Sequence, residues 1–387
     1  MSSHYDVVAN IDTDRNTLAA VVRITVPASD VQPANEFLLG GTYAVSSVNA
    51  GRSATAEVAR TDKPFPGLQN ITVRCRLPRH DDLRLEVRYA GPLTALTTPP
   101  LNAITPDLIE LSLDSFWLPV ADGFKKFTVH ADIRGVPRDL VAVSQGIVRR
   151  SGGDVLIERR TPDVDLAFVA MRGLQRATAD GFEFYAADLA TNASEVYLRH
   201  GKAIVRFLED WFGTMPGRPA RVVIVRRQRK SGYNRFGYIV MTDGGPQEEA
   251  ELAQFMAHEF AHSWWSPCDP RTEHRWLSES IAEYVALRYI EVAFGPNARD
   301  KALAIKRESA AKAGPLLGAG EREDAELYNK GPLLLADLET KIGRARIDSL
   351  LAELAHHPPH VTAEFMRALA ARAGDEAASA FEQSMRR

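Results

Sequence analysis

The stretch His258-Glu259-Phe260-Ala261-His262 places two histidines four residues apart. In an α-helix, residues four apart lie on the same face, one above the other, so both imidazoles can be directed at a single point. Glu259 lies one step around the same helix, where it can reach a water molecule at that point without being a ligand itself. The spacing therefore predicts a pair of metal ligands with a carboxylate beside them. An exposed helix with two unrelated histidines would carry the same five residues.

H-E-x-x-H on a helix is typical of zinc peptidases, in which the glutamate serves as the general base. A catalytic zinc site needs a third protein ligand and keeps its fourth position for water. The candidate is Glu279, seventeen residues past His262 (279 − 262), in the run Trp276-Leu277-Ser278-Glu279-Ser280. This run begins a second predicted helix, which ends at Gly295-Pro296.

These two motifs resemble those of the gluzincins in the M1 aminopeptidase family, whose pattern is H-E-x-x-H, a loop, and W-L-N-E-G. Here the Asn and the Gly of the second motif are both replaced by Ser, and the loop is about two residues shorter than usual for the family. The resemblance implies that Glu279 joins the two histidines in holding one Zn²⁺ ion, with Glu259 as the catalytic base. A third match, Tyr328-Asn329-Lys330-Gly331, corresponds to the family's Y-x-K-G motif. It implies that the Tyr328 hydroxyl hydrogen-bonds the tetrahedral intermediate, which suits a phenol because it donates without being charged.

Glu283 lies four residues after Glu279 and therefore on the same face of the second helix. A metal-bound histidine usually needs a hydrogen-bonded partner for its other ring nitrogen, and a carboxylate is a common one. We expect Glu283 to be such an outer carboxylate. A solvated glutamate on an exposed helix face fits the sequence equally well.

The length of 387 residues predicts two domains, and a change in periodicity divides them near residue 185. Residues 1–185 contain apolar runs between turn signals, several of which alternate with period two, as half-buried antiparallel strands do. We expect a β-sandwich here, and the region resembles the saddle-shaped N-terminal domain of M1 enzymes. Residues 186–387 have mainly helical periodicity, and the resemblance implies a thermolysin-like catalytic domain. The expected fold is a two-domain α+β protein, with strands at 18–26, 70–77, 83–89, 127–133, 164–169 and 221–226, a strand in the second half of 231–240, and a helix at 195–212.

The composition bears on location and partners. A net charge of −3 with 25% charged residues gives no sign of binding to nucleic acid or to an anionic membrane. Cys75 and Cys268 are too few for a disulfide framework, which favours a reducing compartment. Cys268 lies close to His262 in the sequence, but the ligand set is complete without it. The chain start lacks a signal peptide and no run is long enough to span a membrane, so we expect a cytoplasmic protein.

Two departures from the M1 pattern concern the substrate. The family's G-x-M-E-N glutamate, which binds the free α-amine, has no counterpart; alignment through residues 236–239 puts Asn234 there. A second amine-binding position, usually glutamine, falls on Glu110, which could supply the missing negative charge, although it could also be a charged residue on the polar face of a strand. The long C-terminal helical domain of many members is missing, so the resemblance is to a short form. Its cleft is expected to be open, or shielded by a partner or a second copy of the chain.

The expected activity is hydrolysis of peptide or amide bonds with one zinc ion, and an aminopeptidase is the leading interpretation. An endopeptidase, or an amidase dedicated to a small metabolite, would use the same zinc site without a free amine. A non-catalytic M1-like scaffold that binds through its β domain is a further alternative. The presence of both histidines, both key glutamates and Tyr328 favours an enzyme, because a binding module does not need this set.

Overall fold

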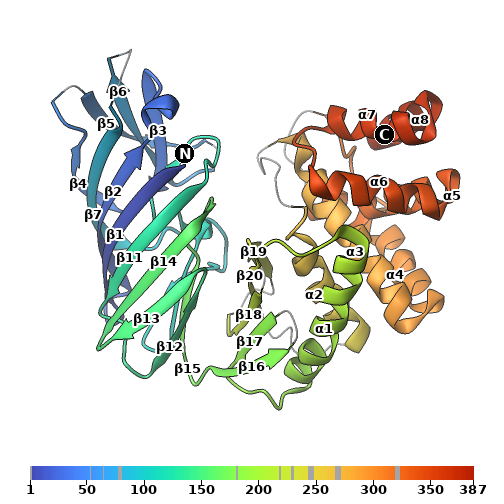
Figure 1. Cartoon of the computed structure of the whole chain (residues 1–387), viewed down its shortest axis with the longest axis horizontal. Helices are drawn as coiled ribbons and strands as arrows, with labels where there is room; N and C mark the ends of the chain where they lie inside the picture. The colour runs from blue at the N-terminus through green and yellow to red at the C-terminus, as the bar shows by residue number, and fades with distance from the viewer. Residues whose placement is uncertain are drawn as a thin grey trace.

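The computed structural model describes residues 2–52, 54–63, 65–76, 81–179, 182–217, 219–227, 231–242, 248–265, 272–318 and 323–387. A β-rich N-terminal region is followed by a mainly helical C-terminal region, and the two lie side by side (Figure 1). Cys268, considered above as a ligand, lies outside the described residues. Among the described residues, no helix combines the length and the apolar character needed to cross a bilayer.

Three sheets form the N-terminal region, and their strands alternate buried and exposed residues as the sequence predicts. In β2, for example, the side chains of Leu18, Val22 and Ile24 are buried in one apolar core. The strand orders are β13-β14-β11-β1-β2-β7-β4, β10-β3-β6-β5 and β12-β15-β9-β8. The strands are β1 (Ser3–Asp12), β2 (Thr17–Val26), β3 (Ala34–Gly40), β4 (Ala44–Asn49), β5 (Ala54–Thr61), β6 (Leu68–Cys75), β7 (Leu83–Pro92), β8 (Ala103–Ile104), β9 (Leu108–Leu111), β10 (Val120–Ala121), β11 (Phe127–Arg134), β12 (Leu140–Ser144), β13 (Ile147–Ser151), β14 (Asp154–Asp163) and β15 (Phe168–Arg172).

The structure confirms a mostly antiparallel β region and departs from the expectations in one strand pairing and in the start of one strand. The largest sheet is not purely antiparallel, because β1 pairs with β11 in parallel. The strand expected at 164–169 begins only at Phe168, since the four residues before it connect β14 to β15. Asp165 in this connection accepts hydrogen bonds from the Leu113 backbone and from Arg235, which a regular strand pairing would not provide.

A fourth sheet spans the predicted domain boundary. Its order is β16-β17-β18-β20-β19, with β17 parallel to β18 and β18 parallel to β20. The boundary between residues 185 and 186 falls at the end of β17, within this sheet, and the division at that point stays a prediction. The strands are β16 (Gln175–Ala179), β17 (Phe182–Ala186), β18 (Ala220–Val225), β19 (Gly232–Arg235) and β20 (Tyr238–Thr242).

The helices of the C-terminal region pack around α3, most of whose residues are buried. Helices α2, α4 and α5 all contact it, so the second predicted helix is the centre of the bundle. Gly295 ends α3 with a φ of 89°, a conformation that glycine adopts without strain. The helices are α1 (Asn192–Phe212), α2 (Glu249–Ala261), α3 (Trp276–Phe294), α4 (Pro296–Ser309), α5 (Gly331–Ile342), α6 (Arg344–His356), α7 (Thr362–Ala373) and α8 (Asp375–Met385), with the 3-10 turns η1 (Ala28–Asp30), η2 (Leu113–Ser115) and η3 (Glu273–Arg275) and the π-helical turn η4 (Ala325–Lys330).

The hairpin of β19 and β20 connects the two regions beside α2. Its turn is Phe236-Gly237, where both residues have a positive φ. On one side, Arg235 bonds to Asp165 at 3.1 Å and the Tyr238 hydroxyl donates to the Val143 carbonyl at 3.0 Å. On the other side the hairpin contacts α2, which carries the histidine motif. The hairpin therefore forms one wall beside that motif.

Candidate metal centre

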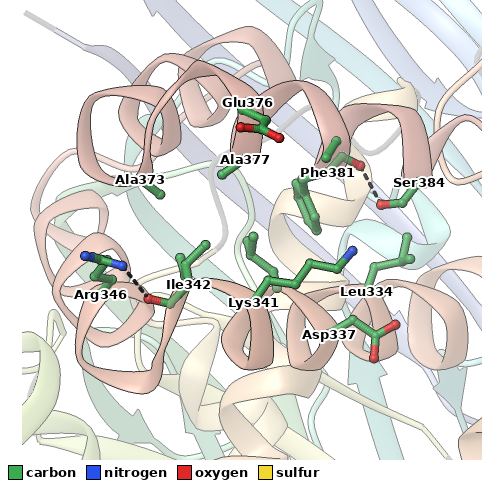
Figure 2. A pocket seen from close by; sticks show the side chains of 12 residues that line it. Leu334, Asp337, Lys341, Ile342, Arg346, Ala373, Glu376, Ala377, Phe381 and Ser384 are labelled. Atoms are coloured by element: carbon green, nitrogen blue, oxygen red, sulfur yellow. Dashed lines mark hydrogen bonds between the residues drawn. The ribbon is translucent and has the colours of Figure 1, made fainter.

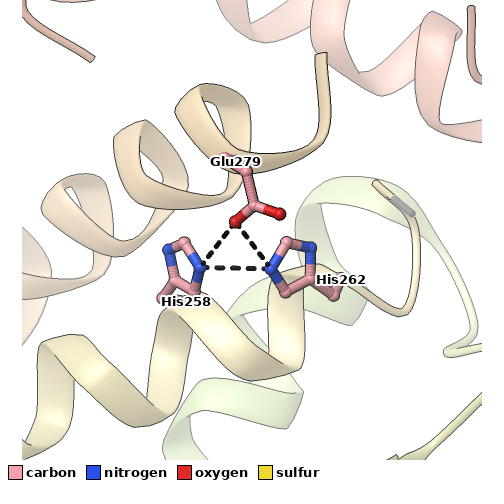
Figure 3. Close-up of side chains that lie close together, drawn as sticks. All are labelled: His258, His262 and Glu279. Atoms are coloured by element: carbon pink, nitrogen blue, oxygen red, sulfur yellow. Dashed lines mark hydrogen bonds and ion pairs between the residues drawn. The ribbon is translucent and has the colours of Figure 1, made fainter. Parts of the chain in front are cut away.

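Three side chains converge where α2 meets α3 (Figure 3). His258 lies in the last turn of α2, His262 caps its C-terminus, and Glu279 lies in the first turn of α3. The two Nε2 atoms are 3.1 Å apart, and each is 3.5 Å from the Glu279 Oε2 atom. Tetrahedral ligands about 2.0–2.1 Å from a zinc ion lie about 3.3 Å from one another, so this triangle has the size that zinc requires.

In both imidazoles, Nδ1 faces a hydrogen-bond acceptor and Nε2 faces the other candidate ligands. His258 Nδ1 is 2.8 Å from a Glu283 carboxylate oxygen, and His262 Nδ1 is 3.2 Å from the Trp265 carbonyl oxygen. Both partners only accept hydrogen bonds, so we place a proton on each Nδ1 atom. In neutral imidazoles the two Nε2 atoms, 3.1 Å apart, would then both carry lone pairs directed at the same point. A cation among the three ligand atoms resolves this repulsion, and the residues fit the zinc site that the sequence predicts.

Glu283 of α3 contacts His258, and its role as an outer carboxylate stays a prediction. One of its oxygens accepts from His258, and the other accepts from Gln254 Nε2 and from Lys306 Nζ, each at 2.6 Å. Burial alone would raise the pKa of this carboxyl, but Lys306 and His258 hold it well below its usual range. Glu283 is therefore an ionised acceptor that fixes the ring of His258, rather than a solvated surface residue.

Ser278, in the place of the family's asparagine, orients the other histidine. Its hydroxyl donates to the Trp265 carbonyl at 2.7 Å and lies 3.2 Å from His262 Nδ1, from which it can accept. From the sequence, this serine was identified only as a departure from the W-L-N-E-G motif. Its polar side chain next to a predicted metal ligand indicates such a role.

Glu259 is buried beside the candidate metal ligands, and among the described residues one of its oxygens, Oε2, has no hydrogen-bond partner. Burial raises the pKa of this carboxyl above its usual value, while the two histidines oppose the shift. Its other oxygen faces Gly232 of β19 so closely that a Cβ atom there would lie 2.4 Å away. The wall strand thus fixes the position of the carboxylate without hydrogen-bonding to it.

Tyr328 lies beside the candidate ligands, in the π-helical turn η4. Its ring centroid is 5.6 Å from that of His258, and its hydroxyl interacts electrostatically with Glu279. Burial and the charge of Glu279 raise the pKa of Tyr328 well above its usual range, so the hydroxyl stays protonated and can donate. Arg275 lies beside both residues, 3.9 Å from Glu279, and was not identified from the sequence.

Asn234 and Glu110, the two residues predicted to bind an amine, have other partners. The Asn234 amide donates to the Glu259 carbonyl at 2.9 Å and to Ser263, and accepts from the backbone N–H of Gly237. Its hydrogen bonds therefore hold the hairpin turn to α2. Sequence alignment could not show this, because the partners lie on two other segments.

Glu110 is fully buried in β9 and forms an ion pair with Arg227. Tyr233 donates to the same carboxylate oxygen at 3.3 Å, while the other oxygen has no partner. Burial raises the pKa of Glu110 to about 7, against the effect of Arg227. Tyr233 and Asn234 are consecutive in β19 and so point to opposite faces, which puts Glu110 and Asn234 on different sides of the wall strand. Neither residue has a described contact with the metal ligands, and an amine-binding role stays a prediction for both.

A cavity of about 300 Å³ lies elsewhere, between α5, α7 and α8 (Figure 2). Leu334, Leu338 and Phe381 contribute apolar surface, and charged residues such as Lys341 and Glu376 also line it. None of the metal-centre residues lines it. This cavity is therefore separate from the candidate metal centre at the junction of α2 and α3.

Comparison with solved structures identifies the fold. The M1 zinc metallopeptidase of Deinococcus radiodurans superposes with a TM-score of 0.77 at 22% sequence identity, over 99% of this chain and 94% of that one. A variant of that enzyme, solved with a Tyr-Ser-Ala substrate, gives a TM-score of 0.74 at 21% identity over the same shares. Leukotriene A4 hydrolase of Saccharomyces cerevisiae gives a TM-score of 0.74 at 15% identity, over 99% of this chain and 68% of that one. No protein-family model and no curated protein sequence matches this chain.

The chain therefore has the two-region fold of the M1 zinc metallopeptidases, from the N-terminal sheets to the last helix. The M1 resemblance predicted from the motifs is confirmed at the level of the fold. At these sequence identities the structural similarity shows the fold and does not identify the substrate.

Proposed function

We propose that this protein is a zinc-dependent hydrolase of peptide or amide bonds, and that it holds one zinc ion through His258, His262 and Glu279. The observation that carries the proposal is the convergence of two imidazole Nε2 atoms and one carboxylate oxygen within 3.5 Å of one another. A scaffold that only binds other molecules would not need this arrangement with Glu259 and Tyr328 beside it.

The protein's own groups supply the proton transfers. Zinc, when bound, contributes Lewis-acid activation of the attacking water and of the scissile carbonyl. Glu259, whose Oε2 atom has no protein partner, takes a proton from the water and delivers it to the leaving nitrogen, which departs as an amine. The Tyr328 hydroxyl donates to the oxygen on which negative charge develops. The products are a carboxylic acid and an amine.

Aminopeptidase action is the leading specificity. The fold supports it, because the similar Deinococcus enzyme is described with a tripeptide, Tyr-Ser-Ala, as substrate. In that case Glu110, or a group that replaces it, would bind the substrate's α-amine. We also propose that the protein acts as a soluble peptidase in the cytoplasm, and that a second copy of the chain can shield the cleft.

Cleavage of substrates without a free amine is the second candidate, and one observation favours it. The Asn234 amide donates hydrogen bonds to Glu259 of α2 and to Ser263. The negative charge of Glu110 is balanced by Arg227. Neither residue then offers a free negative charge to an ammonium group. An endopeptidase or a dedicated amidase would have no need of one.

The test measures zinc content and then hydrolysis of aminoacyl-anilides against their N-acylated equivalents. The purified protein should hold one zinc ion per chain, and Glu259→Gln should lower kcat by roughly 10²- to 10⁴-fold with zinc retained. Glu251→Gln, on an exposed face of the same helix, is the matched control and should leave kcat unchanged. A protein that binds no zinc, or a fully active Glu259→Gln variant, would refute the proposal. Preference for the N-acylated substrates would replace the aminopeptidase assignment with the second candidate.

A further inference from the structure

Lys306 is a buried lysine in α4 that reaches two parts of the metal centre at once. Its side chain is 9% exposed, and its Nζ atom donates to Glu283 Oε1 at 2.6 Å and to the Tyr328 carbonyl oxygen at 2.8 Å. A buried ammonium group is costly unless its hydrogen bonds are made, so these two contacts explain its presence there. Glu283 orients a metal ligand, and Tyr328 carries the hydroxyl that donates to the substrate.

The Tyr328 carbonyl lacks the donor that a regular α-helix would give it. That donor would be the backbone N–H of residue 332, four positions later, but residue 332 is a proline and has no N–H. The proline ring also crowds the carbonyl of the residue four before it, and the chain responds with the π-helical turn η4. The N–H of Gly331 accordingly bonds back five residues, to the Glu326 carbonyl.

The carbonyl of Leu327, the residue before Tyr328, also accepts a hydrogen bond from a side chain. Ser280 of α3 donates to the Leu327 carbonyl at 2.7 Å, and it sits so close to Gly331 that a Cβ atom on that glycine would lie 1.9 Å from the serine hydroxyl. Two neighbouring carbonyls thus accept hydrogen bonds from side chains of α3 and α4. Fixing both peptide groups fixes the direction in which the Tyr328 side chain leaves the backbone.

We propose that Lys306 is a positioning residue that, with Pro332, sets the Tyr328 hydroxyl at its working distance from the metal ligands. The inference rests on the proposed hydrolytic function. Lys306 touches neither the substrate nor a metal ligand, and it acts on the reaction through the backbone of Tyr328. An apolar residue at this position would fill the space but leave the Tyr328 carbonyl without a donor.

The first test replaces the ammonium group with a side chain of similar length. Lys306→Met should lower kcat by roughly 10- to 100-fold, the usual effect of misplacing a reacting group by about 1 Å, while KM changes by less than about threefold and zinc stays bound. Lys306→Arg keeps the charge and the donors and should restore part of the activity. Lys301→Met is the matched control, because Lys301 lies on the same helix with an exposed side chain paired to Glu248, and kcat should not change.

The second test separates positioning from general support of the fold. In a Tyr328→Phe background the hydroxyl is gone, so adding Lys306→Met should cost less than about threefold more. Pro332→Ala returns an N–H to the Tyr328 carbonyl without removing a charge, and it should also lower kcat in the wild-type background but not in the Tyr328→Phe background. If Lys306→Met does not fold, the Pro332→Ala variant still tests whether the bonding of the Tyr328 carbonyl positions the Tyr328 hydroxyl.

Structure provides a readout that does not depend on activity. In a crystal structure of Lys306→Met, or of Pro332→Ala, the Tyr328 hydroxyl should be displaced while His258, His262 and Glu279 keep their places. Losses that add fully in the double variants, or an unmoved Tyr328, would overturn the role of Lys306. A Tyr328→Phe variant as active as the wild type would instead contradict the proposed function.

Discussion

Gly232 of β19 offers the sharpest test of where Glu259 works. A Cβ atom at this position would lie 2.4 Å from Glu259 Oε1, 2.6 Å from Cδ and 2.9 Å from Cγ. Cβ atoms normally keep at least 3.4 Å from such neighbours, so Gly232→Ala requires a shift of about 1 Å (3.4 − 2.4) in the carboxylate or the strand. The φ of Gly232 does not lie in the left-handed region, so alanine is permitted there and the effect is one of space alone.

The expected loss follows from that displacement. A misplacement of about 1 Å in a reacting group costs roughly 100-fold in rate, which corresponds to about 2.7 kcal/mol in the activation free energy. Zinc binding should be preserved, because the three atoms nearest to the new methyl group all belong to Glu259 and not to a ligand. Overpacking in a buried site also lowers the free energy of unfolding, by about 1–3 kcal/mol.

The assay compares kcat/KM of Gly232→Ala with that of the wild type, and zinc content is measured on the same samples. Gly153→Ala is the control, since its nearest neighbour to a Cβ atom is the Val136 carbonyl oxygen at 3.8 Å. In a Glu259→Gln background the Gly232→Ala change should cost almost nothing more, because the base is already lost. Activity of Gly232→Ala within threefold of the wild type, or an equal loss in both backgrounds, would refute the placement of Glu259 as the base.

Two further outcomes follow from the electrostatics. Glu283→Gln removes the ionised acceptor of His258 Nδ1, so zinc affinity should fall roughly 10- to 100-fold in competition with a chelator, whereas Glu251→Gln should leave it unchanged; equal affinities would contradict the outer-carboxylate role. Glu110 has a pKa raised to about 7 by burial, so its contribution to stability is complete below the pKa of the unfolded carboxyl, about 4.3, and is lost as the pH rises through about 7. The glutamine of Glu110→Gln cannot ionise, so this variant serves as the reference. In urea titrations, the free energy of unfolding of the wild type relative to the variant should fall by up to about 3 kcal/mol between pH 4.5 and 7.5. A constant difference would show that Glu110 keeps an ordinary pKa.

The sequence predicted the parts of the fold that depend on local periodicity. Strand β2 and helix α1 were expected at 18–26 and 195–212, and the structure has them at Thr17–Val26 and Asn192–Phe212. The parallel pairing of β1 with β11 was not expected, because these strands lie more than a hundred residues apart and neither carries a local signal of its partner's direction. The strand expected at 164–169 begins late because Asp165 serves as an acceptor for two distant groups.

At the site, motif spacing predicted the residues that lie on one helix or at the start of the next. His258 and His262 converge because helical residues four apart share a face, and Glu283 shares a face with Glu279 for the same reason. The alignment-based assignments of Glu110 and Asn234 depended on how separate segments meet. Their partners, Arg227 and the backbone of α2, come from elsewhere in the chain.

By itself, the sequence determined which side chains could hold a metal and which carboxylate could act as the base, since helix geometry follows from the order of residues alone. Only the tertiary structure decided how those groups are supported. Three contacts between segments provide this support: Ser278 with Trp265, Gly232 with Glu259, and Lys306 with the Tyr328 carbonyl. No periodicity along the chain encodes them. The physical reason is that helix formation depends on neighbours within one turn, whereas side-chain orientation in a buried site depends on whichever donors and acceptors packing brings within hydrogen-bond distance.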